Sequence, residues 1–283
     1  MYRYKKMLYR YSIDKLQLKY FDDGYISVAI KGENSKLFLF ERIERYLRYE
    51  VYEVYYKKDD ELCNIGILSF KEKGVVILEV ANKLLYTSTL EFIKIFESEY
   101  GLRFKTFSKI ELCCDSNVNL PYKLDRTLHS TKYKITRCNR DSLTKNGNLR
   151  IGGKYIENLV TLNKDSKDKK AITYYYAPVR THGCKKGQYV QLVGYDKKKE
   201  IEEKEAKYYI LDGLAFAMDS VYRLEIRTCG FEMKQFGIDL QTLYDNLSDM
   251  EHWKNLFLSY INRFFEFHDG KRKFTVSEIL GIE

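Results

Sequence analysis

Runs of apolar, β-branched and aromatic residues recur along the N-terminal third of the chain, separated by turn formers such as Asp22-Asp23-Gly24. Runs of this kind favour β-strands. The predicted strands are Lys15–Tyr20, Tyr25–Lys31, Asn64–Phe70 and Val75–Val80. Between them, Ser35–Val54 places apolar residues at helical spacing, and this pattern predicts a helix.

A better-marked helix follows these strands. Ser88-Thr89-Leu90-Glu91 has the form of a capping box, and Gly101 ends an apolar stripe that runs from Leu90 to Tyr100. The next segment, Lys109–Asp115 (KIELCCD), is short and mostly apolar, so we expect a buried strand with charged residues at its start, third position and end.

The same pattern begins again after Pro121. Helices are predicted over Leu124–Leu128 and over the Lys- and Glu-rich segment Lys197–Leu211. The predicted strands of this part are Tyr133–Cys138, Leu149–Ile151, Ile172–Tyr176, Tyr189–Tyr195 and Val221–Thr228. From Leu240 to Phe267 an aromatic stripe at helical spacing predicts a C-terminal helix.

This order of elements predicts an α+β fold with antiparallel sheets covered by helices, two similar α+β halves and a C-terminal helix. We expect an N-terminal half over residues 1–120, a C-terminal half over 121–235 that completes the catalytic site, and a helical extension over 236–283. A chain of 283 residues can bury one large core or two small ones.

The charge of the chain favours a polyanionic partner. Lys and Arg number 49 against 40 Asp and Glu, which gives a net charge of +9. The 26 tyrosines add rings on which the bases of single-stranded DNA can stack. The alternative is that the charge only keeps the protein in solution and the rings belong to the core.

The chain has no stretch of about 20 apolar residues, the length that spans a bilayer. Its first residues are basic and aromatic and do not resemble a secretory signal. We therefore expect a cytoplasmic protein that does not bind a membrane.

Several kinds of chemistry find no motif in the sequence. The four histidines are isolated, the six cysteines contain no CxxC pair, and no phosphate-binding glycine loop occurs. A bound metal would then be held by carboxylates, which favours Mg²⁺ or Mn²⁺.

Two strand-like segments carry charge at alternate positions. Because side chains alternate between the faces of a strand, one face of the first segment presents Lys109, Glu111, Cys113 and Asp115. One face of Tyr222–Arg227 presents Arg223, Glu225 and Arg227 in the same way. Carboxylates buried on these faces would be costly unless their charge were offset by an arginine, by a partner on a neighbouring strand or by a metal. The alternative is a solvent-facing antiparallel sheet.

A third charged segment, Tyr195–Glu200, lies where a predicted strand opens into a helix. A tyrosine here stands beside acids that are candidate metal ligands and lysines that are candidate phosphate contacts. The alternative is that Asp196 and Glu200 only mark the first turn of the helix.

Taken in order, these three segments resemble the motifs RIDxAxD, YDKxxE and RxExR of the replication initiation factor family. That family includes initiators of rolling-circle plasmids, replication proteins of filamentous phages and relaxases of some conjugative elements. The resemblance covers roughly residues 15–230 and includes the upstream segment Leu85–Tyr100. Lys109 and Glu111 replace the usual Arg and Asp of the first motif.

The resemblance implies an endonuclease and strand transferase that nicks and rejoins origin DNA through a tyrosine, with a 5′-phosphotyrosine intermediate and Mg²⁺ or Mn²⁺ as cofactor. The implied metal ligands are Glu111, Asp115, Glu225 and Glu200. The candidate nucleophiles are Tyr195, which ranks first, Tyr189 and Tyr176. For each of these tyrosines, packing in the core is the alternative.

The expected partner is DNA at a replication origin, in a single-stranded or cruciform region. The candidate DNA contacts are Arg180, Lys185, Lys186, Lys197, Lys198, Arg223 and Arg227. A homodimer and a host helicase are further candidate partners. The competing hypothesis is a basic protein that binds DNA or RNA without cutting it, and a third is a partner-binding role for the stripe from Trp253 to Phe267.

Overall fold

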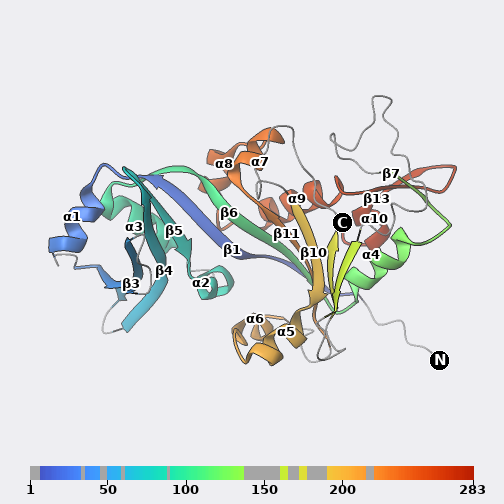
Figure 1. Ribbon diagram of the computed structural model, residues 1–283, viewed down its shortest axis with the longest axis horizontal. Coiled ribbons are helices and arrows are strands. Elements are labelled where there is room, and N and C mark those ends of the chain that lie inside the picture. Colours follow the sequence, from blue (N-terminus) through green and yellow to red (C-terminus); the bar gives the residue numbers. More distant parts are fainter. Residues whose placement is uncertain are drawn as a thin grey trace. The chain divides into compact units, whose positions relative to one another are not determined.

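The computed structural model describes residues 7–32, 36–44, 50–58, 61–87, 90–136, 160–164, 172–176, 190–214 and 220–283. The chain divides into two compact units, each built from antiparallel strands and helices (Figure 1). Unit 1 comprises residues 1–12, 111–228 and 249–283, and unit 2 comprises residues 13–110 and 229–248. The predicted α+β class, with antiparallel sheets and a helix near the C-terminus, is confirmed. The three-part division at residues 120 and 235 stays a prediction.

Strands β1 (Tyr9–Phe21) and β6 (Arg103–Ser116) each contribute residues to both units. In unit 2 the hydrogen-bonded strand order is β2-β3-β4-β5-β1-β6. Its other strands are β2 (Phe38–Arg42), β3 (Glu50–Lys58), β4 (Glu61–Glu72) and β5 (Val75–Val80). Its helices are α1 (Tyr25–Gly32), α2 (Asn82–Thr87), α3 (Glu91–Tyr100), α7 (Gly230–Gln235) and α8 (Leu240–Asp245).

The core of unit 2 forms because alternate residues of its strands are apolar and meet an apolar helix face. Phe96 of α3 lies edge-on to Phe38 of β2, with ring centroids 5.2 Å apart. Gly101 ends α3 in the left-handed conformation, at a φ of 60° that glycine adopts without strain. The predicted end of this helix is therefore confirmed.

Two predictions for unit 2 are wrong. Tyr25–Lys31, expected as a strand, is helix α1, in which Ile26 is buried whereas Tyr25 and Val28 are exposed. Ser35–Val54, expected as a helix, contains β2 and the start of β3. Phe38, one of the apolar residues that suggested helical spacing, instead pairs across strands with Tyr56. Cross-strand packing of this kind outweighs local spacing.

In unit 1 the strand order is β6-β11-β10-β9-β8, and a second sheet has the order β13-β12-β7. The strands not yet given are β7 (Lys134–Thr136), β8 (Val160–Lys164), β9 (Ile172–Tyr176), β10 (Gln191–Asp196), β11 (Tyr222–Thr228), β12 (Glu266–His268) and β13 (Lys273–Thr275). The helices are α4 (Leu120–Leu128), α5 (Lys197–Lys204), α6 (Tyr209–Asp212), α9 (Met250–Ile261) and α10 (Val276–Leu280).

Two predicted helices of this region are interrupted. Glu205 adopts a left-handed conformation and ends α5, so the segment 197–211 forms α5 and α6. The predicted C-terminal helix is divided into α8 and α9, because Asp249 caps a new helix start, and its last residues form β12. The predicted aromatic stripe does face the core, since Trp253, Phe257 and Tyr260 are buried.

Helices α4 and α9 pack against β11 and cover its apolar side chains, Leu224 and Ile226. Because a strand presents alternate residues to opposite faces, Arg223, Glu225 and Arg227 lie on the other face. The packing of the apolar face thus fixes where the charged face of β11 points. None of the helices in the described ranges has the length and apolar character needed to span a bilayer.

Gly66 provides a test of how tightly β4 and β5 approach. The β3–β4 register shifts between Val54 and Tyr55, and Gly66, at the shift, has a φ of 150°. A Cβ at this position would overlap the carbonyl oxygen of Glu79 on β5. We expect Gly66→Ala to lower the free energy of unfolding by about 3 kcal/mol or more, from backbone strain and overpacking together.

The matched control is Gly237→Ala, because Gly237 also has a positive φ, of 74°, but no atom within 4 Å of an added Cβ. It should cost only about 1–2 kcal/mol. Chemical denaturation of both variants measures the difference. Equal losses of stability would contradict the close approach of the two strands.

Candidate active site

The charged faces of β6 and β11 meet side by side in unit 1. Asp115 contacts Arg223, Cys113 contacts Glu225, and Glu111 contacts Arg227. Residue numbers rise along β6 as they fall along β11, which is the pattern of antiparallel neighbours. The alternation predicted for both segments is therefore confirmed.

Most of these side chains are buried. Asp115 and Glu225 are each 1% exposed, Glu111 is 8% exposed and Arg223 is fully buried. The alternative of a solvent-facing sheet is therefore wrong for these positions. Burying so many charges without compensation would cost several kcal/mol for each, so their partners decide what the face can do.

Asp115 is compensated by a single arginine. Arg223 donates from Nε to Asp115 Oδ1 at 2.7 Å and from its Nη2 to Asp115 Oδ2 at 2.8 Å. This two-pronged geometry is the strongest form of an arginine–carboxylate pair. Both oxygens of Asp115 thus face a guanidinium.

Glu225 is contacted from two sides. Arg227 donates from Nε to Glu225 Oε1 at 2.6 Å, and the hydroxyl of Tyr195 donates to Glu225 Oε2 at 2.7 Å. Tyr195 lies on β10 directly opposite Arg223 of β11. Its side chain reaches diagonally to Glu225, two residues further along β11. A predicted nucleophile and a predicted metal ligand are therefore hydrogen-bonded to each other.

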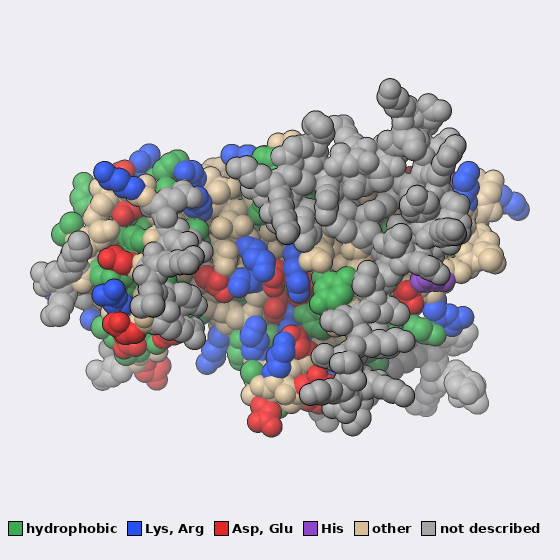
Figure 2. All heavy atoms as spheres, in the orientation of Figure 1, with side chains coloured by type: hydrophobic (Ala, Val, Ile, Leu, Met, Phe, Trp, Pro, Cys, Tyr) green, Lys and Arg blue, Asp and Glu red, His purple; other side chains and the backbone are tan. Residues whose placement is uncertain are grey.

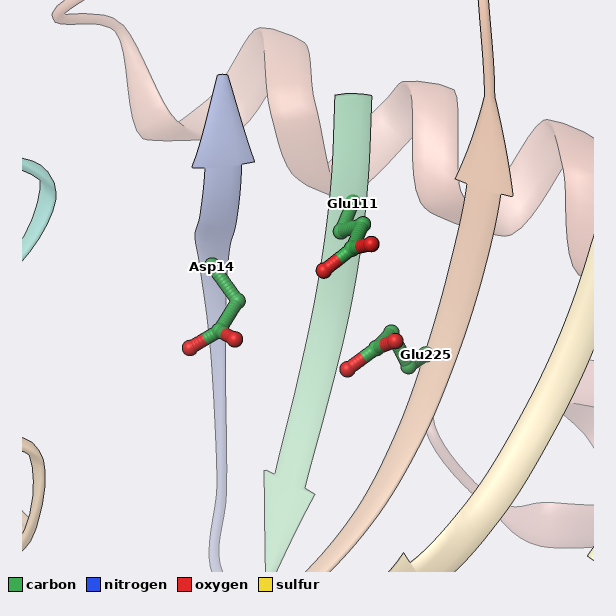
Figure 3. Close-up of side chains that lie close together, drawn as sticks. All are labelled: Asp14, Glu111 and Glu225. Carbon is green, nitrogen blue, oxygen red and sulfur yellow. The ribbon is translucent and has the colours of Figure 1, made fainter. Parts of the chain in front are cut away.

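Two buried acids of unit 1, Glu111 and Glu225, come from the neighbouring strands β6 and β11, and the close-up shows them directed toward each other (Figure 3). Glu111 and Glu225 belong to the same compact unit. A set of carboxylate oxygens fits a hard divalent cation such as Mg²⁺ or Mn²⁺.

Asp14 is a buried acid of unit 2 that the sequence analysis did not select. The predicted strand began one residue later, at Lys15. In the structure Asp14 shares a buried strand face with Leu16, Leu18 and Tyr20, and its Oδ1 accepts a hydrogen bond of 2.6 Å from Tyr86. The signal that would have identified Asp14 is its position: it stands two residues before Leu16, where the alternation of the apolar face continues.

The protein environment changes the acidity of two groups at this site. Burial raises the pKa of the Tyr195 phenol well above its usual value, and the negative charge of Glu225 raises it further. For Arg227, burial lowers the pKa, but Glu225 and Glu111 more than offset this and raise it overall. The phenol is thus neutral at physiological pH and the guanidinium is charged.

The other predicted site residues lie elsewhere or outside the described residues. Tyr176 is buried on β9, and its hydroxyl donates to the carbonyl of Pro121. Glu200 accepts from Lys197 and Lys204 on α5, and these lysines offset the effect of burial and lower its pKa. Tyr189, Arg180, Lys185 and Lys186 fall outside the described residues.

The lysines that follow Tyr195 differ in exposure. Lys197 is buried and lies with Nζ 5.7 Å from the centroid of the Tyr195 ring. Lys198 is half-buried at the start of α5. Figure 2 shows Lys and Arg side chains mixed with acidic ones near α5 and the neighbouring strand ends, next to surface that is not described.

Comparisons with known proteins find similar chains among solved structures only. No family model matches the chain, and no curated protein matches it. Among solved structures, the chain is similar to that of a rolling circle replication initiator protein from Geobacillus stearothermophilus, with a TM-score of 0.46 and 10% sequence identity. The similarity covers 92% of this chain and 87% of that one.

The Asp115–Arg223 pair yields a stability prediction. Asp115→Asn removes the charge of the carboxylate to which the fully buried guanidinium of Arg223 donates two hydrogen bonds. We expect the free energy of unfolding to fall by about 3–5 kcal/mol, measured by urea denaturation. Replacing both residues by leucine should recover much of that loss, because a neutral pair leaves no buried charge.

Asp249→Asn serves as the control, because Asp249 is exposed and accepts from the backbone N–H of Glu251 as an N-cap. Asparagine caps helices about as well as aspartate, so this variant should stay within roughly 0.5 kcal/mol of the wild type. A similar small loss for Asp115→Asn would contradict the pairing.

Proposed function

We propose that this protein nicks and rejoins DNA through Tyr195, as an initiator of rolling-circle replication. The observation that carries the proposal is the 2.7 Å hydrogen bond from the Tyr195 hydroxyl to Glu225, whose carboxylate shares a buried face with Glu111. The order of the three sequence motifs supports the same assignment. The net charge of +9 suits a nucleic-acid substrate.

Glu225 holds the phenol in a fixed position for attack. The phenol first loses its proton to water, the phenolate oxygen then forms a bond to phosphorus, and the bond from phosphorus to the 3′ oxygen breaks. The departing 3′ oxygen takes up a proton from water. The 5′ end of the strand stays on Tyr195, which conserves the bond for rejoining.

Glu111 and Glu225 are the proposed ligands of a divalent cation. Such a cation would supply positive charge that stabilises the phenolate and the charge growing on the phosphate oxygens. Burial and Glu225 raise the pKa of Tyr195 and so favour the neutral phenol. The positive charge of a cation would lower this pKa and favour the phenolate.

The remaining predicted residues take supporting roles in the proposal. Asp115 positions Arg223, and Arg223 in turn stands opposite Tyr195 on the neighbouring strand. Lys197, Lys198 and the basic residues outside the described ranges, Arg180, Lys185 and Lys186, are proposed phosphate contacts. Cytoplasmic location, a homodimer and a host helicase stay predictions.

A covalent-adduct assay tests the nucleophile. Incubating the protein with single-stranded origin DNA and Mn²⁺ should give a protein–DNA adduct, and mass spectrometry of the attached peptide should identify Tyr195. We expect Tyr195→Phe to abolish the adduct, because the attacking oxygen is removed. Glu225→Gln should lower its rate about a hundredfold or more.

Tyr176→Phe is the matched control, since the Tyr176 hydroxyl bonds only to a backbone carbonyl in the described structure. It should form the adduct at the wild-type rate. An adduct on Tyr189 or Tyr176 would contradict the assignment of Tyr195. DNA binding with no adduct under any metal condition would favour the alternative of a basic binding protein that does not cut.

The pH dependence of adduct formation follows from the raised pKa of Tyr195. The attacking species is the phenolate, and its fraction grows with pH as long as the pH stays below the pKa. We expect the single-turnover rate to rise by up to about tenfold per pH unit between roughly pH 6 and 8. A rate that is flat over this interval would contradict attack by a phenol of raised pKa.

A further inference from the structure

A hollow in unit 1 lies along helix α4, away from the acids just described. Its volume is about 480 Å³, within the range of roughly 300–1,000 Å³ that ligand sites occupy. Residues of α4 and of the segment that leads to β7 line it. Helix α4 packs with its other side against β10 and β11 (Figure 1).

The lining of this hollow is basic and contains no carboxylate. Lys123 and Arg126 supply its charges, and the remaining polar lining comes from Asn119, Thr127 and Ser130. Lys123 donates from Nζ to the carbonyl of Leu280 at 3.0 Å, a neutral acceptor that leaves its positive charge uncompensated. Asp125, the acid of the same helix, instead contacts His129. The hollow therefore attracts an anion.

Aromatic rings stand beside these cations. Tyr122 is 48% exposed, and the guanidinium of Arg126 lies 5.8 Å from the centroid of its ring. Tyr133 lies at the far end of the segment that lines the hollow. Its ring contacts Phe267 and Phe274 edge-on, and these contacts hold the ring in place. Exposed rings beside cations are the combination that binds nucleotides, because bases stack on the rings while phosphates meet the charges.

We propose that the hollow formed by Tyr122, Lys123, Arg126 and Tyr133 binds a nucleotide of single-stranded nucleic acid, with its phosphate at Arg126 and Lys123 and its base on Tyr122. This extends the proposed function, on which the choice of DNA as the nucleic acid rests. The described residues that line the hollow include no acid that would bind a metal or assist cleavage, so the role we assign to it is to hold the strand.

Binding of a fluorescently labelled single-stranded oligonucleotide tests this site, with fluorescence anisotropy as the readout and EDTA present to prevent cleavage. Arg126→Gln should weaken binding and reduce the slope of log K against log salt by about 0.7, the value for one phosphate contact on a single strand. Tyr122→Leu should weaken binding about tenfold with an unchanged salt slope, because stacking carries no charge.

Lys73→Gln is the control for charge. Lys73 is exposed in the turn between β4 and β5 of unit 2, and the variant removes the same charge as Arg126→Gln. It should leave the affinity and the salt slope at wild-type values. Thermal unfolding of each variant checks that the fold is retained, which we expect because the Tyr122 and Arg126 side chains are exposed.

Competition separates the sources of the ligand. A free mononucleotide should compete for wild-type protein and lose this ability with Arg126→Gln, whereas an acidic peptide should compete weakly. Wild-type affinity for the oligonucleotide in both Arg126→Gln and Tyr122→Leu would overturn the inference. So would an acidic peptide that competes as well as DNA and is insensitive to Tyr122→Leu.

The outcome is independent of the proposed nicking. If the wild-type protein forms the Tyr195 adduct but the two hollow variants bind DNA normally, this inference fails and the proposed function stands. If no adduct forms but the hollow variants lose affinity, the proposed function fails and the site on α4 stands.

Discussion

The burial of carboxylates on the shared face of β6 and β11 is the constraint on which the rest of the structure depends. A charged side chain removed from water needs an opposite charge close by, and the two strands meet this need differently along their length. Asp115 is matched by Arg223 in a two-pronged pair. Glu111 and Glu225 both contact Arg227.

The position of Glu225 connects the fold to the proposed chemistry. The apolar face of β11, covered by α4 and α9, holds the strand so that Glu225 faces Tyr195 of β10. Burial and the negative charge of Glu225 raise the pKa of the Tyr195 phenol. In the proposed function, a divalent cation held by Glu111 and Glu225 would favour ionisation of this phenol.

The sequence was sufficient for those parts of the site that follow from strand alternation. The segments KIELCCD and Tyr222–Arg227 have a period of two that places Glu111, Asp115 and Glu225 on charged faces, and the structure confirms this placement. Alternation does not reveal which strands are neighbours. It therefore left open that Asp115 pairs with Arg223, whereas Glu225 receives the Tyr195 hydroxyl.

Other features depended on contacts distant in sequence. Asp14 comes from the first strand and accepts its hydrogen bond from Tyr86, 72 residues further along the chain, so nothing local relates the two. The segment Ser35–Val54 had a helical spacing, but pairing of Phe38 with Tyr56 made strands of its described parts. Tertiary packing overrode local pattern in both places. The hollow on α4 likewise depends on how the segment after the helix turns back to Tyr133.

The central claim, that Glu111 and Glu225 hold a divalent cation beside Tyr195, is tested most directly by counting bound Mn²⁺ with electron paramagnetic resonance. The wild-type protein should bind Mn²⁺ at this site, and Glu111→Gln combined with Glu225→Gln should remove that binding, whereas Tyr195→Phe should retain it. Equal Mn²⁺ binding by the wild-type protein and the double variant would contradict the account.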